Sequence, residues 1–455
     1  MKIPPALGIA CVLLALGALL GGLRWLQSRR ALHPELVRKL MHVGMGLVAL
    51  TFPRLFDQPW PVLVLSGTAL ALLAAVRWVG PLRRSLGSVL GGVERTSLGE
   101  FYFAGAVAMV FWLSRETNFP RGTNLFFIIP VLILTLADAV GALIGTRYGL
   151  ARYTTDDGGH KSVEGSLAFF LAAFFSTHVP LLLCSDTGRG ASLLIGVTLG
   201  LLLVLIEAIA WRGLDNLFIP LTAFIALRIY LHLSVPALVG RVLVLAGLIL
   251  CLLIWKRHTY LNSSASLGAA LVLYLSWSIG GLAWLAAPAL LLAGYSLFCC
   301  PPDHPEARGS HPARGVLALA AGGLGWLFFA LAFDQPDRVF PFYVAFAAQM
   351  ALVSVADRLL RDSAGRPGAK IWLHATALGL GVVLAPCLLL SWLGGKTTPP
   401  ALAGQAALGA LVVAGATAAF LLWQVRRHGC EVDDARWLRQ GAIGAAATLA
   451  VAWAA

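Results

Sequence analysis

Long apolar stretches alternate with short polar loops along nearly the whole chain. A helix that crosses a bilayer needs about 20 largely apolar residues, and the sequence repeats such stretches often enough to predict an all-α, polytopic membrane bundle of about 14–16 transmembrane helices. The predicted spans cover residues 5–23, 40–56, 61–78, 99–114, 125–145, 165–184, 191–211, 216–235, 238–255, 262–278, 281–299, 315–333, 341–357, 371–393, 402–424 and 440–455. No polar segment is long enough to form a separate soluble domain.

Composition supports a membrane protein and excludes a soluble fold. Hydrophobic residues make up 59% of the chain and charged residues only 12%, whereas a soluble domain carries about 25% charged residues. The net charge of +13 would suggest nucleic acid in a soluble protein. Here the basic residues lie in loops between spans, without a basic stripe and interleaved aromatics, so we expect no nucleic-acid partner.

The distribution of Lys and Arg among the loops predicts the topology. Alternate loops are basic, and short cytoplasmic loops are the ones that carry an excess of Lys and Arg. The basic set is Arg24–Lys39, Arg77–Arg95, Arg147–Lys161, Lys256–His258, Arg358–Lys370 and Arg426–Arg439. These loops are expected in the cytoplasm of a bacterial inner membrane protein, with Arg115–Arg121 as an exception.

Unusual polar residues concentrate in the first half of the chain, which suggests two domains, 1–236 and 237–455. Ionisable residues near a membrane core are costly and usually mark function. The segment Glu35–His42 enters the second predicted span, where Arg38 and His42 share a helical face. Arg38 and Lys39 suit phosphate oxygens, although basic residues here could also serve only as a topology anchor.

Asp138 lies about two turns inside the fifth predicted span. An unpaired carboxylate at this depth would be expensive, so a metal ion or a basic partner is expected beside it. Gly141 and Gly145 follow on one helical face and permit close approach of another helix.

Two further segments begin helices with small and hydroxyl residues. Lys161, Ser162, Gly165 and Ser166 open the sixth predicted span, where backbone N–H groups favour a phosphate and the lysine adds a positive charge. Residues Glu94–Glu100 open the fourth span in a similar way, but a capping box explains them more simply.

Three carboxylates complete the predicted site. Glu207 lies near the end of the seventh span, and Asp215 and Asn216 begin the eighth. With Asp138, these acids offer the hard oxygen ligands that Mg²⁺ prefers when it holds a polyphosphate. Carboxylates, lysines and helix starts at one membrane face fit phosphoryl or nucleotidyl transfer, which relies on positioning and charge neutralisation.

The same segments resemble the polyprenol kinase family, which includes phytol kinase, dolichol kinase and CTP-dependent diacylglycerol kinase. The matching segments are Arg38–His42, Thr96–Glu100, Leu136–Gly149, Lys161–Ser166, Glu207 and Leu214–Pro220. The resemblance is closest to phytol kinase. It implies transfer of a γ-phosphate, typically from CTP, to the hydroxyl of a membrane lipid alcohol such as an isoprenoid alcohol or diacylglycerol.

The resemblance also implies roles for individual residues. Asp138 and Asp215 would act on the hydroxyl proton or hold Mg²⁺ together with Glu207, and Lys161 would contact phosphate. The implied nucleotide and phosphate contacts are Arg38, Lys39, His42, Ser162, Gly165, Ser166 and Asn216. ATP in place of CTP, a cytidylyltransferase that makes a CDP-lipid, and a transporter stay open as alternatives.

The second half is similar, over a shorter stretch, to the membrane family that contains phytyl-phosphate kinase. The similar segments are Asn262–Ala269, Gly280–Trp284 and Ala356–Arg358. A fused enzyme that phosphorylates its product a second time is one interpretation. A scaffold, a lipid-binding module or a degenerate domain are the others.

Overall fold

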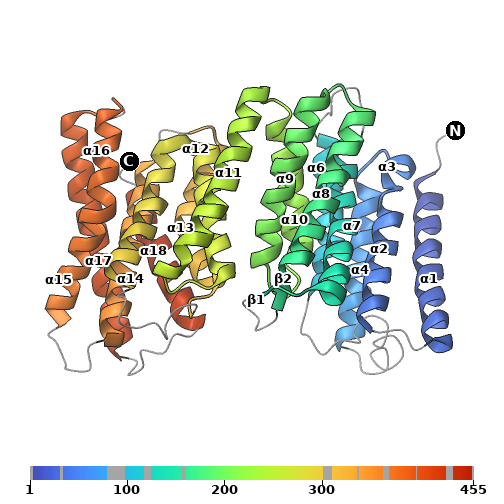
Figure 1. Ribbon diagram of the computed structural model, residues 1–455, viewed down its shortest axis with the longest axis horizontal. Helices are drawn as coiled ribbons and strands as arrows, with labels where there is room; N and C mark the ends of the chain where they lie inside the picture. Colours follow the sequence, from blue (N-terminus) through green and yellow to red (C-terminus); the bar gives the residue numbers. More distant parts are fainter. Residues whose placement is uncertain are drawn as a thin grey trace. The chain divides into compact units, whose positions relative to one another are not determined.

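The computed structural model is almost entirely helical, which confirms the predicted all-α membrane bundle (Figure 1). It describes residues 4–30, 34–78, 98–116, 124–154, 160–300, 310–335, 338–361, 368–395, 397–426 and 434–452. The predicted helix start at Glu94–Ser97 lies outside the described residues. Helices dominate because a segment in lipid must satisfy its backbone hydrogen bonds internally.

The chain forms two compact units, Met1–Ala246 and Gly247–Ala455. The division falls inside helix α11 (Val235–Trp255), ten residues after the boundary between 236 and 237 suggested by the sequence. The first unit contains α1 (Pro5–Arg29), α2 (Pro34–Ala49), α3 (Phe52–Leu55), α4 (Trp60–Trp78), α6 (Gly99–Glu116), α7 (Leu125–Tyr148), α8 (Val163–Cys184), α9 (Arg189–Ile209) and α10 (Asp215–Tyr230).

Ten helices of the described residues are long and apolar enough to cross a membrane. This number is below the predicted 14–16, and helix length explains part of the difference. The α2 and α10 helices have only 16 residues each. The two predicted spans 262–278 and 281–299 both lie in the helical stretch α12 (Ser263–Phe298), which a kink at Gly281, where φ is +72°, divides into two helices.

Helix α7 forms the centre of the first unit. It packs against α2, α6, α8 and α10, and half of its most apolar stretch is buried. Its buried face includes Phe126, Ile133 and Leu134. Because α7 contacts four other helices, a polar residue on it can be reached from several directions.

A two-stranded hairpin connects α7 to α8 and contains the only β-strands among the described residues of this unit. Strand β1 (Arg152–Thr154) pairs antiparallel with β2 (His160–Ser162), so that Tyr153 lies opposite Lys161. Figure 1 shows the hairpin at the end of the unit where α7 ends and α8 begins. The sequence analysis expected only a polar loop there.

Small residues allow α7 and α8 to approach closely, as the glycine spacing predicts. A Cβ on Gly165 would lie 2.8 Å from the Gly141 carbonyl oxygen and 3.0 Å from Gly145 Cα. Both obstacles are backbone atoms, which cannot move aside as a flexible side chain can. Gly165 therefore sets the distance between α7, which carries Asp138, and α8, which follows the strand that carries Lys161.

Gly165→Ala is accordingly expected to destabilise the protein by about 1–3 kcal/mol, because the added methyl forces α7 and α8 apart. Thermal unfolding in detergent measures the change. Gly105→Ala on α6 is the matched control, since a Cβ there meets no atom within 4 Å. Equal unfolding temperatures for the two variants would contradict the close packing.

The second unit surrounds helix α14 (Phe340–Arg361), the most buried span of the described chain, with 89% of its apolar stretch inside the unit. Around it lie α12, α13 (Ala313–Ala332), α15 (Gly368–Leu378), the π-helical turn Gly379–Leu384, α16 (Ala385–Leu393), α17 (Pro399–Arg426) and α18 (Asp434–Ala452). A short 3₁₀ turn, Lys256–His258, precedes α12. The start of the similar segment Asn262–Ala269 caps a helix, since the Asn262 side chain accepts a hydrogen bond from Ala265 N–H.

Candidate active site

The partner that Asp138 requires is Lys39. The Lys39 ammonium on α2 donates to both carboxylate oxygens of Asp138 on α7, at 2.8 and 2.7 Å. Both side chains are largely withdrawn from solvent, with 4% of Lys39 and 14% of Asp138 exposed. Two opposite charges buried together at this distance compensate each other, whereas either one alone would be strongly unfavourable.

His42 and Arg38 extend the charged group on α2. His42 Nε2 lies 2.9 Å from the Leu134 carbonyl oxygen and 3.6 Å from Asp138 Oδ2. A carbonyl oxygen only accepts, so Nε2 carries the proton. The His42 ring also packs edge-on against Phe103, with centroids 5.0 Å apart. Arg38 is exposed and adds positive charge near Asp138.

A second ion pair joins the hairpin to α9. Lys161 on β2 donates to Glu207 Oε1 at 2.7 Å and also to the Glu207 backbone carbonyl. Asp215, the first residue of α10, adds negative charge near Lys161. The second oxygen, Glu207 Oε2, is buried and accepts no hydrogen bond in the part of the chain that the structure describes. One acceptor therefore remains available beside a lysine.

The surroundings fix the protonation of the hairpin residues. Burial would lower the pKa of Lys161, but the charges of Glu207 and Asp215 outweigh burial and raise it above its ordinary value. Lys161 is therefore charged at neutral pH. Burial and the charge of Glu207 raise the pKa of Tyr153 to about 12, so its phenol keeps its proton. The Tyr153 hydroxyl lies 2.8 Å from Ser166 Oγ.

Other predicted residues have structural contacts of their own. Ser162 caps α8, with its hydroxyl accepting from Gly165 N–H at 3.0 Å, and Gly165 faces α7. The Asn216 amide donates to the Gly99 carbonyl at 3.0 Å and ties α10 to α6. Their contact with nucleotide stays a prediction. The motifs in the sequence do not single out Tyr153. Its only signal is that Tyr153 and Thr154 are residue types that favour strands.

The described residues do not form a ready-made magnesium site. Among them, no three His, Cys, Asp or Glu side chains gather closely enough to hold a metal ion. Both Asp138 oxygens already accept from Lys39, and Glu207 pairs with Lys161. The three carboxylates predicted to bind Mg²⁺ thus belong to two separate charged groups: Asp138 lies with Lys39, and Glu207 and Asp215 lie with Lys161. Their role in binding Mg²⁺ stays a prediction.

The two ion pairs nevertheless lie at the same end of the first unit. Asp138 is seven residues before Gly145, which corresponds to about 10 Å along α7. Gly145 in turn meets the start of α8, where a Cβ would lie 3.0 Å from Ser162 Oγ. Lys161 immediately precedes Ser162, in the hairpin that Figure 1 places at this end. Four of the six predicted segments thus supply two lysine–carboxylate pairs, and Gly145, beside the strand that carries the second pair's lysine, lies about two helical turns from Asp138.

A comparison with known proteins identifies the family. The chain is 31% identical over 200 residues to a protein from Synechocystis sp. described as phytol kinase, and the match covers 80% of that relative. The chain belongs to the phytol kinase family. This confirms the family that the motifs of the first half resemble. The match spans 43% of this chain, so more than half of the chain lies outside the matched region.

No protein-family model and no solved structure matches the chain.

Proposed function

We propose that this protein is a lipid-alcohol kinase that transfers the γ-phosphate of a nucleoside triphosphate, CTP in the first place and ATP otherwise, to a membrane alcohol. Phytol, geranylgeraniol, another polyprenol and diacylglycerol are the candidate acceptors. The observation that carries the proposal is the 31% identity to phytol kinase. The two lysine–carboxylate pairs support it, since phosphoryl transfer depends on positioned charges.

The Lys161 group supplies what the transfer requires. The acceptor hydroxyl oxygen attacks the γ-phosphorus, the bond to the bridging oxygen breaks, and the nucleoside diphosphate leaves. Lys161 is charged and neutralises the negative charge that develops on the phosphoryl oxygens. Glu207 Oε2, buried and without a hydrogen-bond donor among the described residues, accepts the hydroxyl proton. Asp215 keeps the lysine charged.

The Lys39–Asp138 pair has a different role in this proposal. Both Asp138 oxygens are engaged, so the pair positions α2 against α7 and presents Arg38 at the phosphate side. We place the site at the cytoplasmic face of a bacterial inner membrane, because the adjoining loops carry the excess of Lys and Arg. A lipid in the bilayer and a nucleotide from the cytosol could both reach this face.

The assay that tests the proposal follows label from nucleotide to lipid. Purified full-length protein in detergent with Mg²⁺ is incubated with CTP or ATP labelled at the γ- or the α-phosphate, and with each candidate alcohol. Transfer of γ-label alone to an alcohol is expected, with CTP used more efficiently than ATP. EDTA tests the requirement for Mg²⁺.

The label position separates the alternatives. Appearance of α-label in lipid would indicate a cytidylyltransferase and overturn the proposal. Absence of any labelled lipid across the whole panel, with protein shown to be folded by thermal unfolding, would also overturn it.

A further inference from the structure

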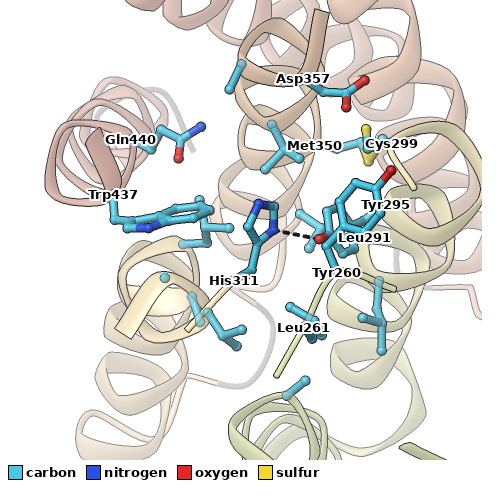
Figure 2. Close-up of a pocket in the computed structure, with 18 of the residues that line it drawn as sticks. Tyr260, Leu261, Leu291, Tyr295, Cys299, His311, Met350, Asp357, Trp437 and Gln440 are labelled. Atoms are coloured by element: carbon cyan, nitrogen blue, oxygen red, sulfur yellow. Dashed lines mark hydrogen bonds between the residues drawn. The ribbon is translucent and has the colours of Figure 1, made fainter. Parts of the chain in front are cut away.

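The second unit contains a cavity of about 450 Å³ that is separate from both ion pairs (Figure 2). Sites for small molecules are typically roughly 300–1,000 Å³. Most of the wall is apolar and comes from α12, α13 and α14, with Leu291, Ala320 and Met350 among its residues. Such a wall, in a unit built of membrane helices, suits a hydrocarbon chain.

Polar groups gather on one part of the wall, beginning with His311. His311 precedes α13 and is anchored by its backbone: its N–H donates to Tyr260 and its carbonyl accepts from Asn262. Its Nδ1 lies 2.6 Å from the Tyr295 hydroxyl. Burial, followed by the charge of Arg436, lowers the pKa of His311 to about 4. The ring is therefore neutral at pH 7.

The second ring nitrogen of His311 faces the cavity. Figure 2 shows Nδ1 directed to Tyr295 and Nε2 directed away from it, toward the interior. No hydrogen bond to Nε2 is formed within the described residues. When the Tyr295 hydroxyl donates to Nδ1, a neutral ring carries its proton on Nε2 and offers a donor to the cavity.

Helix α18 supplies the complementary acceptor. Arg436, Trp437 and Gln440 occupy one face of it and line the cavity. Gln440 is fully buried, and Figure 2 shows its amide group extending toward the cavity. The amide nitrogen donates to the Leu352 carbonyl at 3.4 Å. The amide oxygen, Oε1, has no hydrogen-bond partner in the described chain, although buried polar atoms nearly always have one.

We propose that this cavity binds a neutral lipid alcohol, with its hydrocarbon chain among the apolar residues and its hydroxyl between His311 Nε2 and Gln440 Oε1. A hydroxyl group both accepts and donates, so it satisfies both atoms at once. The inference does not depend on the proposed kinase reaction, because it concerns binding in a different unit.

Charge favours an alcohol over its phosphate ester. The wall carries one positive group, Arg436, which lies near His311, and one negative group, Asp357, so these two charges of the wall offset each other. A phosphate dianion would bring no proton to Gln440 Oε1. Burying a charge without compensation is much more costly than burying a hydroxyl with both hydrogen bonds made.

Photolabelling of the full-length protein tests the site. The probe is a long-chain primary alcohol with a diazirine in its chain, and labelled peptides are identified by mass spectrometry. Labels are expected on α12, α13 and α14 around the cavity. Unlabelled alcohol should compete, and its monophosphate should compete at least about ten-fold more weakly.

Variants define the hydroxyl contact. Gln440→Leu removes the acceptor and should reduce labelling of the cavity about five-fold, the effect of one lost hydrogen bond. Gln424→Leu on α17, also buried but outside the cavity wall, should leave it unchanged. Ala320→Leu narrows the apolar part and should also reduce it. Thermal unfolding shows that each variant is folded.

Three outcomes would overturn the inference. These are labels absent from the cavity wall, equal labelling of wild type and Gln440→Leu, or a monophosphate that competes as well as the alcohol. Labels in the first unit report on the kinase site separately, so failure of one proposal leaves the other standing.

Discussion

Lys39→Met is expected to destabilise the first unit by about 3–5 kcal/mol, the usual effect of leaving one member of a buried ion pair without its partner. Methionine has similar length and fills the same space, so packing changes little. What changes is Asp138, whose two carboxylate oxygens lose their donor while only 14% of the side chain reaches solvent. Unfolding by heat in detergent measures the loss.

A double variant tests the physical reason. Lys39→Met combined with Asp138→Asn removes both charges and should recover most of the lost stability, since contacting residues are strongly non-additive. Arg38→Met is the matched control because Arg38 neighbours Lys39 on α2 but is exposed. It should change stability by less than about 1 kcal/mol. The ion-pair explanation fails if Lys39→Met is no more destabilising than Arg38→Met, or if the double variant is the least stable.

The helical architecture could be predicted because its cause is local. A run of apolar residues long enough to span lipid has few alternatives to a helix, and each predicted span is mostly helical over the residues that the structure describes. The count was less certain where the local signal is weak. At Gly281 a positive φ divides α12 into two helices, where the predicted spans 262–278 and 281–299 meet, although neither a charge nor a proline marks the place.

The partners of the charged residues could not be predicted, because they depend on which helices become neighbours. The sequence required a partner for Asp138 and left a metal ion and a basic residue both open. The structure supplies Lys39, 99 residues away. Helical periodicity shows which face of a helix a residue occupies, but it contains no information on the helix that packs against that face.

Helix starts illustrate a second limit. Ser162 and Gly165 have the residue types of an anion site, and the same types suit a cap and a close helix contact. In the structure Ser162 caps α8, and Gly165 makes the close contact with α7. The cavity of the second unit was not foreseen for a related reason: Tyr295 lies on α12, His311 in the segment before α13, and Gln440 on α18. None of them is unusual within its own stretch of sequence.

Lys161→Met is expected to reduce phosphoryl transfer about 100- to 1,000-fold, the usual effect of removing one positioned group that stabilises charge in a transition state. Lys161 is charged at neutral pH because Glu207 and Asp215 surround it, and no other lysine in the described residues pairs with Glu207. The effect should appear in kcat and in the KM for nucleotide, and the unfolding temperature shows whether the fold is retained.

Three further variants separate a role in transfer from a role in structure. Lys161→Arg keeps the charge and should recover part of the activity. Glu207→Gln leaves Lys161 free to meet phosphate but removes the proton acceptor, so kcat should fall while the KM for nucleotide changes little.

Arg147→Met removes an exposed basic residue at the end of α7 and should change activity less than about two-fold, as an exposed charge acts weakly. If Lys161→Met and Arg147→Met were equally active, Lys161 would only be holding α9 against the hairpin, and the phosphate would have to be bound elsewhere.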